Sequence, residues 1–569
     1  MYTFAQRLGT DRSIIRCKRC QTFGVHCDGY DIVVSSKKPR PKDLRPLVPM
    51  ARTETKASTR AKIRNPVNVY RQPGSPRFEN ENEARYFNCF HVQIAHSLSR
   101  CFDPEIWPRS FLMASEAVWP IRKGLIALGA LDLTSKEALS QIREGPTKEG
   151  ITDNYLFALQ EYTRFIRGMK QVMAPEDLRT QLLASIIIIC FESYLGDPKA
   201  VEFQVRTCIK LLDQWKKKHQ KPWHHPLKSP APNMVEDELL HLFERLDLEV
   251  ISQNAARDFS REEHLRLKDE GIEAIANMPE AFSGIDEARM YGNLLHRRTV
   301  HFANAYDDKT APHISVWERV SASATPAVLD DFETQRKAWY RWGQAFDPLF
   351  KHSLTPEGAS TFFIMSVLRA HYLVLQLLFE SVFQKDEVFY DYFHNDFVEM
   401  LALCKGLLAN ESSKFVLSAH TIVVLDLVAK KCRDPEVRRE AIKLLGEKPR
   451  REAFWDSVMA AKICAWIMEV EEEGMVNGFI PEESRARKIG AEFNLPKKEA
   501  KIWCYQLKEQ GSSMELRKRE TTITWGTPLG SMPFYSGGNF GEKWEDCAAD
   551  KSPSLFQLSP TGRSLVRPF

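Results

Sequence analysis

The sequence predicts an all-α protein in which a large helical domain follows a basic N-terminal segment. Three observations predict this class. Apolar residues make up 43% of the 569 residues and charged residues 27%, which is the usual balance of a folded globular chain. Beyond Asn80, apolar side chains recur at three- and four-residue steps in many segments, as helices with one buried face require. Alternating segments bounded by hairpin dipeptides are almost missing before Thr521.

The N-terminal segment concentrates positive charge. Residues 1–77 contain 17 Lys and Arg against 5 Asp and Glu, a net charge of +12, whereas the whole chain carries only +4. Residues 35–79 are rich in Lys, Arg, Pro, Ser and Thr and show no helical period, so we expect a flexible basic linker. A basic end of this kind is where a polyanion binds.

The helical domain is expected to begin near Asn80. Its first stripe contains Tyr86 or Phe87, followed by Phe90 and Ile94. Further stripes run through Leu125 to Leu131, Tyr155 to Met169, Leu178 to Leu195, Thr361 to Phe383, Phe415 to Val428 and Phe454 to Val470. The predicted division of the chain is a partial zinc-cluster module at 1–34, a linker at 35–79, a helical domain at 80–511 and a poorly ordered tail at 512–569.

Membrane and secretory signals are weak. The longest apolar run, Leu182 to Phe191, is about half the roughly 20 residues that a bilayer-spanning helix needs. The N-terminus contains Arg7, Arg12 and Arg16 where a secretory signal would have an apolar stretch. We therefore expect no membrane span and a location inside the cell.

Enzyme motifs are missing from the sequence. It contains no metalloprotease H-E-x-x-H, no nucleophile G-x-S-x-G, no dinucleotide G-x-G-x-x-G and no phosphate-binding P-loop, so we expect no enzyme. Residues 124–129 interrupt an apolar stripe with two glycines, which we interpret as close helix packing. Glu262-Glu263-His264 and His224-His225 lack companion ligands at metal spacing, so we expect exposed or locally bonded side chains. Asp386 to Glu399 interleaves acids with aromatics, which fits either an activation segment or, as we prefer, an amphipathic element of the helical domain.

Three cysteines near the N-terminus have a metal-ligand spacing. Cys17, Cys20 and Cys27 form C-x2-C-x6-C. Two thiolates separated by two residues can bind one metal through a tight turn, and a third can extend the thiolate face. Thiolate softness favours zinc. The alternative is three reduced thiols in an unstructured segment.

The cluster resembles the second half of the fungal binuclear zinc-cluster motif, which is C-x2-C-x6-C, a loop, and C-x2-C-x6-C. The tripeptide Asp28-Gly29-Tyr30 after Cys27 resembles the family's usual continuation. The helical region is similar to the fungal-specific transcription factor domain in these segments: Ser97 to Asp103, Trp107, Ile121 to Leu131, Tyr155 to Tyr162, Cys190 to Tyr194 and Ile480 to Cys504.

The resemblance implies a zinc-dependent, DNA-binding transcriptional regulator of RNA polymerase II genes in a fungal nucleus. In the family six cysteines hold two zinc ions, and Cys17, Cys20 and Cys27 match the fourth, fifth and sixth. The first half presents the helix that reads bases, and no cysteine precedes Cys17 in this sequence. Either a first exon is missing from the sequence, which we favour, or the chain is a half-motif descendant.

The remaining cations could bind phosphates without selecting sequence. They are Lys18, Arg19, Lys37, Lys38, Arg40, Lys42 and Arg45. The implied partners are DNA, which is doubtful for this exact chain, transcriptional co-regulators and a second protomer in a homodimer. From another functional class, the alternative is a helical interaction or scaffold protein that has lost sequence-specific DNA binding.

Overall fold

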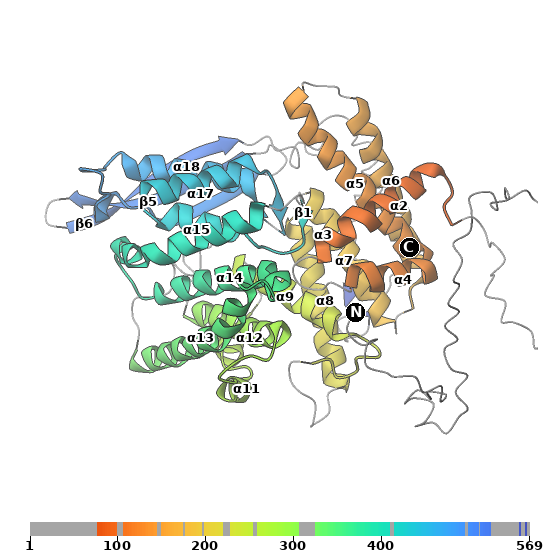
Figure 1. The fold of residues 1–569 in the computed structure, drawn as a ribbon, viewed down its shortest axis with the longest axis horizontal. Helices are drawn as coiled ribbons and strands as arrows, with labels where there is room; N and C mark the ends of the chain where they lie inside the picture. The colour runs from red at the N-terminus through yellow and green to blue at the C-terminus, as the bar shows by residue number, and fades with distance from the viewer. Residues whose placement is uncertain are drawn as a thin grey trace, which may run out of the picture. The chain divides into compact units, whose positions relative to one another are not determined.

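Most of the described residues in the computed structural model are helical, which confirms the all-α class (Figure 1). The structure describes residues 77–99, 106–144, 149–174, 177–195, 198–219, 228–253, 259–306, 325–409, 415–453, 455–494, 499–510, 513–524, 557–558 and 564–565. Residues 1–75 form a separate unit outside the described part, and residues 76–569 form the unit that contains all described elements.

The helices fall into an N-terminal and a central set. The N-terminal set is α2 (Glu81–Cys89), η2 (Phe90–Ile94), α3 (Ala95–Ser99), η3 (Ile106–Phe111), α4 (Leu112–Ala117), α5 (Trp119–Glu144), α6 (Glu149–Val172), α7 (Leu178–Leu195), α8 (Pro198–His219) and α9 (Asp237–Gln253). The central set is α10 (Arg261–Leu267), α11 (Ile272–Ala276), α12 (Ile285–Ala305), α13 (Pro326–Ser353), η6 (Ala359–Thr361), α14 (Phe362–Glu380), η7 (Glu387–Phe393), α15 (His394–Ala409), α16 (Ile422–Lys431), α17 (Pro435–Glu447), α18 (Ser457–Glu472) and η8 (Glu482–Ser484).

Polar residues ahead of several helices explain where the helices start. Asn80 accepts a hydrogen bond from the Glu83 backbone at the start of α2, which agrees with the predicted start of the folded region. Thr325 does the same for α13, where Pro326 takes the first helical position. Each such cap binds one of the backbone N–H groups that the first turn leaves unpaired.

The first hydrophobic core, core one, is built by α2 to α9 and includes every apolar side chain of α7 between Leu182 and Leu195. Helix α7 is apolar on all sides because other helices enclose it. Two glycines of α5 allow close packing, as expected from residues 124–129. A Cβ on Gly129 would lie 2.0 Å from the Tyr86 carbonyl oxygen, and one on Gly124 would lie 2.8 Å from Ile187 Cγ2.

By length and composition, two helical segments of the described part could cross a membrane, Leu178–Leu195 and Ala359–Glu380. In the first of them, 83% of the residues are buried inside the protein. Packing in core one is therefore sufficient to explain its apolar character.

Core two joins α11 to α17 with the end of α9 and the start of α18. Aromatic rings fill its centre. Trp339 donates to Thr299 Oγ1 at 2.9 Å, and Trp342 donates to the Ala288 carbonyl oxygen at 2.9 Å, so both indole N–H groups are paired. The two cores meet along α9, since Val250 belongs to core one and Ile251 to core two.

An antiparallel sheet follows α18 and consists of β4 (Arg487–Asn494), β5 (Glu499–Gln510) and β6 (Ser513–Thr524), in that order. Ala500, Ile502 and Cys504 of β5 pack against Ile467 and other apolar residues of α18. The prediction of a helical domain over residues 80–511 is wrong for the residues of β4 and β5, and the tail predicted at 512–569 includes strand β6. Every second residue of β5 is buried, whereas Lys501 between them is exposed. This two-residue repeat of burial fits a strand with one face on the core and does not fit a helix.

A second small sheet joins the cores. Its strands are β1 (Phe415–Val416), β2 (Arg451–Glu452) and β3 (Trp455–Asp456), with β1 and β2 parallel and β2 and β3 antiparallel. Phe415 and Leu417 belong to core one, whereas Ile422, five residues later, belongs to core two. The segment after β1 therefore passes from one core to the other.

Candidate functional site

The predicted zinc and phosphate ligands lie outside the described residues. This holds for Cys17, Cys20 and Cys27 and for the cations Lys18, Arg19, Lys37, Lys38, Arg40, Lys42 and Arg45. The donor set can still be compared with the chemistry of zinc. Three thiolates supply three of the four ligands of one tetrahedral zinc, so these cysteines do not fit a complete two-zinc cluster.

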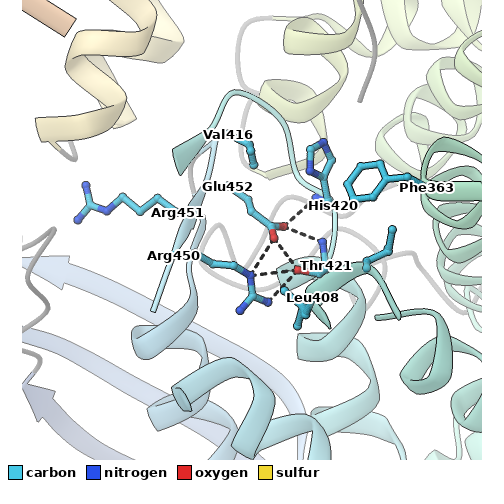
Figure 2. A pocket seen from close by; sticks show the side chains of 9 residues that line it. Phe363, Leu408, Val416, His420, Thr421, Arg450, Arg451 and Glu452 are labelled. Carbon is cyan, nitrogen blue, oxygen red and sulfur yellow. Dashed lines mark hydrogen bonds and ion pairs between the residues drawn. The ribbon is translucent and has the colours of Figure 1, made fainter. Parts of the chain in front are cut away.

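Within the described part, the carboxylate with the most hydrogen bonds is that of Glu452 in β2, and it lies at the start of α16 (Figure 2). Its Oε2 accepts hydrogen bonds from the backbone N–H groups of His420, Thr421 and Ile422 at 2.7, 2.7 and 2.8 Å. Its Oε1 accepts from the Thr421 hydroxyl at 2.5 Å and from Arg450 Nε at 3.0 Å. The carboxylate thus binds backbone groups that the first turn of α16 leaves unpaired.

The charge state of Glu452 follows from these bonds. Burial alone would raise its pKa, but Arg450, His420 and the hydrogen bonds from Ile422 and Thr421 lower the pKa to about 2. Burial lowers the pKa of His420 to about 3. The site therefore contains an ionised carboxylate and a neutral imidazole at neutral pH.

A serine–histidine contact lies beside this carboxylate. Ser418 Oγ is 2.9 Å from His420 Nε2, which is the distance of a nucleophile and its base. Acyl transfer also needs donors for the developing oxyanion. The nearest candidates, the backbone N–H groups of residues 420–422, already donate to Glu452. In this arrangement the N–H groups of residues 420–422 are therefore not free to bind an oxyanion.

A shallow hollow beside Glu452 has room on the scale of a single water molecule. The residues that line it are Phe363, Leu407, Leu408, Val416, His420, Thr421, Arg450, Arg451 and Glu452. A nucleotide or an organic effector needs several hundred Å³. The hollow is therefore too small for such ligands.

Arg451 extends the site to core one. Its Nη1 donates to the Ser193 and Tyr194 carbonyl oxygens at 3.2 Å each, at the C-terminus of α7. The Tyr194 ring also packs against Phe415, with centroids 4.1 Å apart. A cation at a helix C-terminus pairs with carbonyl groups that have no partner within the helix. Residues 450–452 therefore connect both cores.

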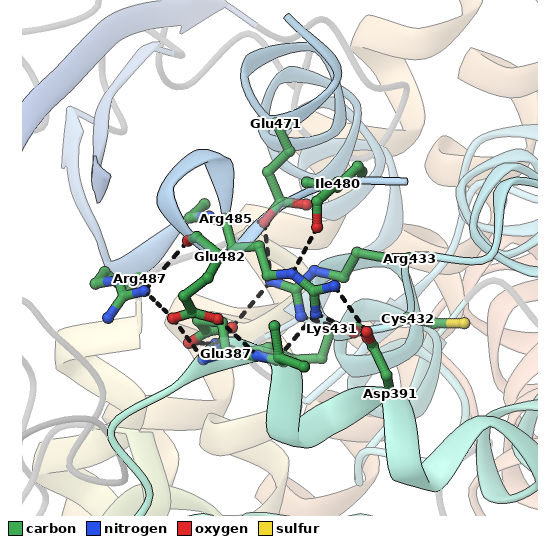
Figure 3. Close-up of polar contacts among 12 residues, drawn as sticks. Glu387, Asp391, Lys431, Cys432, Arg433, Glu471, Ile480, Glu482, Arg485 and Arg487 are labelled. Atoms are coloured by element: carbon green, nitrogen blue, oxygen red, sulfur yellow. Dashed lines mark hydrogen bonds and ion pairs between the residues drawn. The ribbon is translucent and has the colours of Figure 1, made fainter. Parts of the chain in front are cut away.

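A second polar site, the charge network, ties the large sheet to the helices (Figure 3). Its centre contains two buried carboxylates. Glu387 accepts from Lys431 Nζ at 2.9 Å and from Arg433 Nη2 at 2.9 Å. Glu471 accepts from Arg433 Nη2 at 2.8 Å and from Arg438. Burial would raise the pKa of Glu471, but Arg433 and Arg438 hold it below the usual value.

The outer part of the network contains two more acids. Asp391 and Arg485 form two parallel hydrogen bonds of 2.7 Å. Glu482 accepts from the backbone N–H groups of Glu387 and Val388 at 2.9 and 2.8 Å, and it also pairs with Arg487. The bonds join η7, α16, α18 and β4, so the network fixes the position of the sheet. The acids and cations are bonded mainly to one another, which indicates a structural role.

The side chains of Glu262, Glu263 and His264 are predicted to be exposed or locally bonded. Glu263 does form a capping box with Ser260 at the start of α10. His264, however, is fully buried and lies 2.8 Å from His301, Nδ1 to Nδ1. No spacing in the sequence links two histidines 37 residues apart.

The Asp386 to Glu399 segment forms η7 and the start of α15, as the amphipathic interpretation expects. Glu387 and Asp391 bind cations of the charge network, while Tyr392 is 85% exposed. Two acids of this segment therefore form ion pairs within the folded domain.

Metal ligands do not gather in the described part of the chain. Its His, Cys, Asp and Glu side chains form no group of three or more that could hold an ion. The described cysteines, Cys89, Cys190, Cys208, Cys404, Cys432, Cys464 and Cys504, are all buried. The zinc prediction therefore depends on the N-terminal cysteines alone.

Comparison with protein-family models, curated proteins and solved structures gives no match for this chain.

Proposed function

We propose that the protein is a zinc-dependent, DNA-binding transcriptional regulator of RNA polymerase II genes in a fungal nucleus. The observation that carries the proposal is the C-x2-C-x6-C spacing of Cys17, Cys20 and Cys27, directly before Asp28-Gly29-Tyr30 and a basic linker. The all-α body after this linker supports it, because the resembled family has the same order of parts.

Zinc would bind through the three N-terminal thiolates. In this chain they provide three of four ligands for one ion, and zinc would order the short segment around it. A second C-x2-C-x6-C, encoded ahead of this sequence, would supply the ligands for two ions. The expected content is thus one zinc per chain as given and two in a chain with both halves.

DNA contact in this chain would use phosphates. Lys18 and Arg19 lie between Cys17 and Cys20, and the linker contributes Lys37, Lys38, Arg40, Lys42 and Arg45. Cations that contact only phosphates bind DNA with Kd values of roughly 10⁻⁴ to 10⁻⁶ M, and the affinity falls steeply with salt. Base selection needs contacts to base edges, which the other half of the motif would add.

The helical body would carry regulation. Its roles in this proposal are to bind transcriptional co-regulators and a second protomer. The water-sized hollow beside Glu452 makes a protein partner a better candidate than an organic effector at that site.

The alternative is a helical interaction or scaffold protein without sequence-specific DNA binding. One observation favours it, namely that three cysteines cannot fill two tetrahedral zinc sites. In that case the basic segment serves nuclear import or loose phosphate contact.

Zinc content tests the metal part of the proposal. Purified chain is dialysed and its zinc is measured by mass spectrometry, beside the variants Cys20→Ser and Cys547→Ser. We expect about one zinc per chain in the parent and in Cys547→Ser, which changes an isolated cysteine, and a loss in Cys20→Ser. Equal zinc in all three proteins would contradict the assignment.

Selection from random DNA tests the DNA part. The chain as given should bind weakly, with strong salt dependence and no sequence preference. A chain extended with the other half-motif, taken from the genomic sequence upstream, should enrich one site. If the extended chain holds two zincs and still enriches no site, the scaffold alternative is correct.

A further inference from the structure

Two chain segments cross between the cores at the same place, which we call the seam: Glu249 on α9, and Ala419 and His420 in the segment before α16. Val250 belongs to core one and Ile251 to core two. On the other segment, Leu417 belongs to core one and Ile422 to core two. A bond between these segments therefore ties the two crossings together.

Glu249 makes that bond. Its Oε1 accepts a hydrogen bond from the Ala419 backbone N–H at 3.0 Å. Its Oε2 is buried and has no hydrogen-bond partner. An ionised carboxylate in a buried position is stable only when both oxygens are bonded or paired. Glu249 thus has half of the bonds that its charged form requires.

The nearby Glu452, in contrast, has hydrogen-bond donors for both of its carboxylate oxygens. Its two oxygens together accept five hydrogen bonds, three of them from the backbone N–H groups of residues 420–422. It therefore stays ionised, and its negative charge opposes a second charge on Glu249. The two acids at the seam differ in charge state because their hydrogen bonds differ.

The charged and titratable groups around Glu249 are few. Arg245, one turn earlier on α9, favours the ionised form, and Glu452 disfavours it. His371 of α14 and His420 complete the cluster, and burial lowers their pKa values to about 4 and about 3. Both histidines are therefore neutral throughout the range from pH 5 to 8, so Glu249 is the member of this cluster that changes charge there. Asp247, two residues earlier on α9, also has its pKa raised to about 6, but it pairs with Arg297.

We propose that the Glu249 carboxyl is a protonation switch that keeps the seam closed when protonated and loosens it when ionised. The protonated carboxyl carries no charge, so burial of Oε2 without a donor costs less than it does in the carboxylate. The ionised form places a second negative charge near Glu452 with one oxygen unbonded, and opening of the seam to water relieves this cost. The inference is independent of zinc and of DNA.

The direction of the pH effect follows from the same environment. Burial raises the pKa of Glu249 from its usual value of 4.5 to about 7. A raised pKa of an acid means that its contribution to stability is fully present below pH 4.5 and is lost as the pH rises through 7. In that window the opening equilibrium increases by up to about tenfold per pH unit.

Hydrogen exchange measured by mass spectrometry at pH 5.5 and 8.0 tests the switch, with protection factors corrected for the intrinsic pH dependence of exchange. The peptide that contains residues 418–422 should lose at least about tenfold protection in the parent between these pH values. Glu249→Gln is neutral at both values and should lose little. Glu238→Gln makes the same change at an exposed position of α9 and should behave like the parent.

Two outcomes overturn the proposal: constant protection in the parent, or an equal loss of protection in Glu249→Gln. If Glu249→Gln does not fold, the parent decides alone. Its difference infrared spectrum between pH 5.5 and 8.0, measured beside that of Asp247→Asn, should then show a carboxylic acid band that is kept in the variant and disappears as protection falls. A band that disappears only below pH 5.5 also overturns the proposal.

Discussion

His264 Nδ1 lies 2.8 Å from His301 Nδ1, with both side chains buried between α10 and α12. At this distance one nitrogen must donate a proton and the other must accept it, so the pair holds one proton between the two atoms. The Phe259 ring packs against both imidazoles, with centroids 5.5 Å away. The accepting ring must therefore be neutral, and a second proton at the contact would break the bond.

Lowering the pH should break the hydrogen bond between His264 and His301. Burial lowers the pKa of His301 from 6.5 to about 3, so its contribution to stability is present above pH 6.5 and is lost as the pH falls toward 3. His301→Leu removes this titration and also the hydrogen bond to His264, which should lower the free energy of unfolding at pH 7.5 by about 1–3 kcal/mol. Urea unfolding at pH 7.5 and 5.0 measures both effects. His91→Gln changes an exposed histidine and should match the parent.

Glu471 should be the most sensitive acid of the charge network. Glu471→Gln leaves Arg433 and Arg438 buried beside a neutral group, and the loss of a buried partner costs about 3–5 kcal/mol. Glu472, the next residue, pairs with the half-exposed Arg439, so Glu472→Gln should cost less than about 1 kcal/mol. Denaturant unfolding curves of the two variants give the comparison. Equal costs would show that burial of the network contributes little.

Gly129 should tolerate no side chain. Its Cβ would lie 2.0 Å from the Tyr86 carbonyl oxygen, so Gly129→Ala must push α2 away from α5 and should cost about 1–3 kcal/mol or more. Gly446→Ala in α17 adds a methyl group 3.9 Å from Ala461 Cβ and should be neutral or slightly stabilising. Melting temperatures of both variants provide the test. A melting temperature of Gly129→Ala equal to that of the parent would contradict the close approach.

Thiol labelling should separate the N-terminal cysteines from the core. Burial raises the pKa of Cys208 to about 12 and of Cys432 to about 11, so these thiols should react slowly in the folded protein. Cys17, Cys20 and Cys27 should react rapidly only after a chelator removes zinc. Peptide mass spectrometry before and after chelation gives the order of labelling, and labelling in denaturant gives full reaction as a control. Fast labelling of these three cysteines with zinc present would count against the metal site.

The sequence predicted most of the helical stripes because each stripe is a local pattern. The stripe expected from Phe415 to Val428 is wrong at its start, since Phe415 and Val416 form β1 and α16 begins at Ile422. Phe90 and Ile94, spaced by four, are both buried in core one. The large sheet escaped notice for a physical reason. In β5 the buried residues Ile502 and Cys504 alternate with the half-buried Trp503 and Tyr505, so the strand is apolar on both faces and shows little contrast.

The polar sites could not be predicted because their partners are distant in sequence. Asp391 and Arg485 are separated by 94 residues, and Arg451 binds the carbonyl oxygen of Ser193 across 258 residues. A charged residue in a sequence is read as solvent-exposed unless its partner is known. The N-terminal cysteines differ from these sites because their spacing is local and could be read from the sequence. They lie outside the described residues.

Core one includes two residues from the second half of the chain, Phe415 and Leu417. The last carbonyl groups of α7 likewise accept hydrogen bonds from a distant residue, Arg451. During synthesis, the first half of the chain leaves the ribosome long before these residues do. Until Phe415 and Leu417 are made, the part of core one that they cover stays exposed to solvent. Chaperone demand during translation, and the poor solubility expected of fragments that stop between α9 and β1, both follow from this late closure.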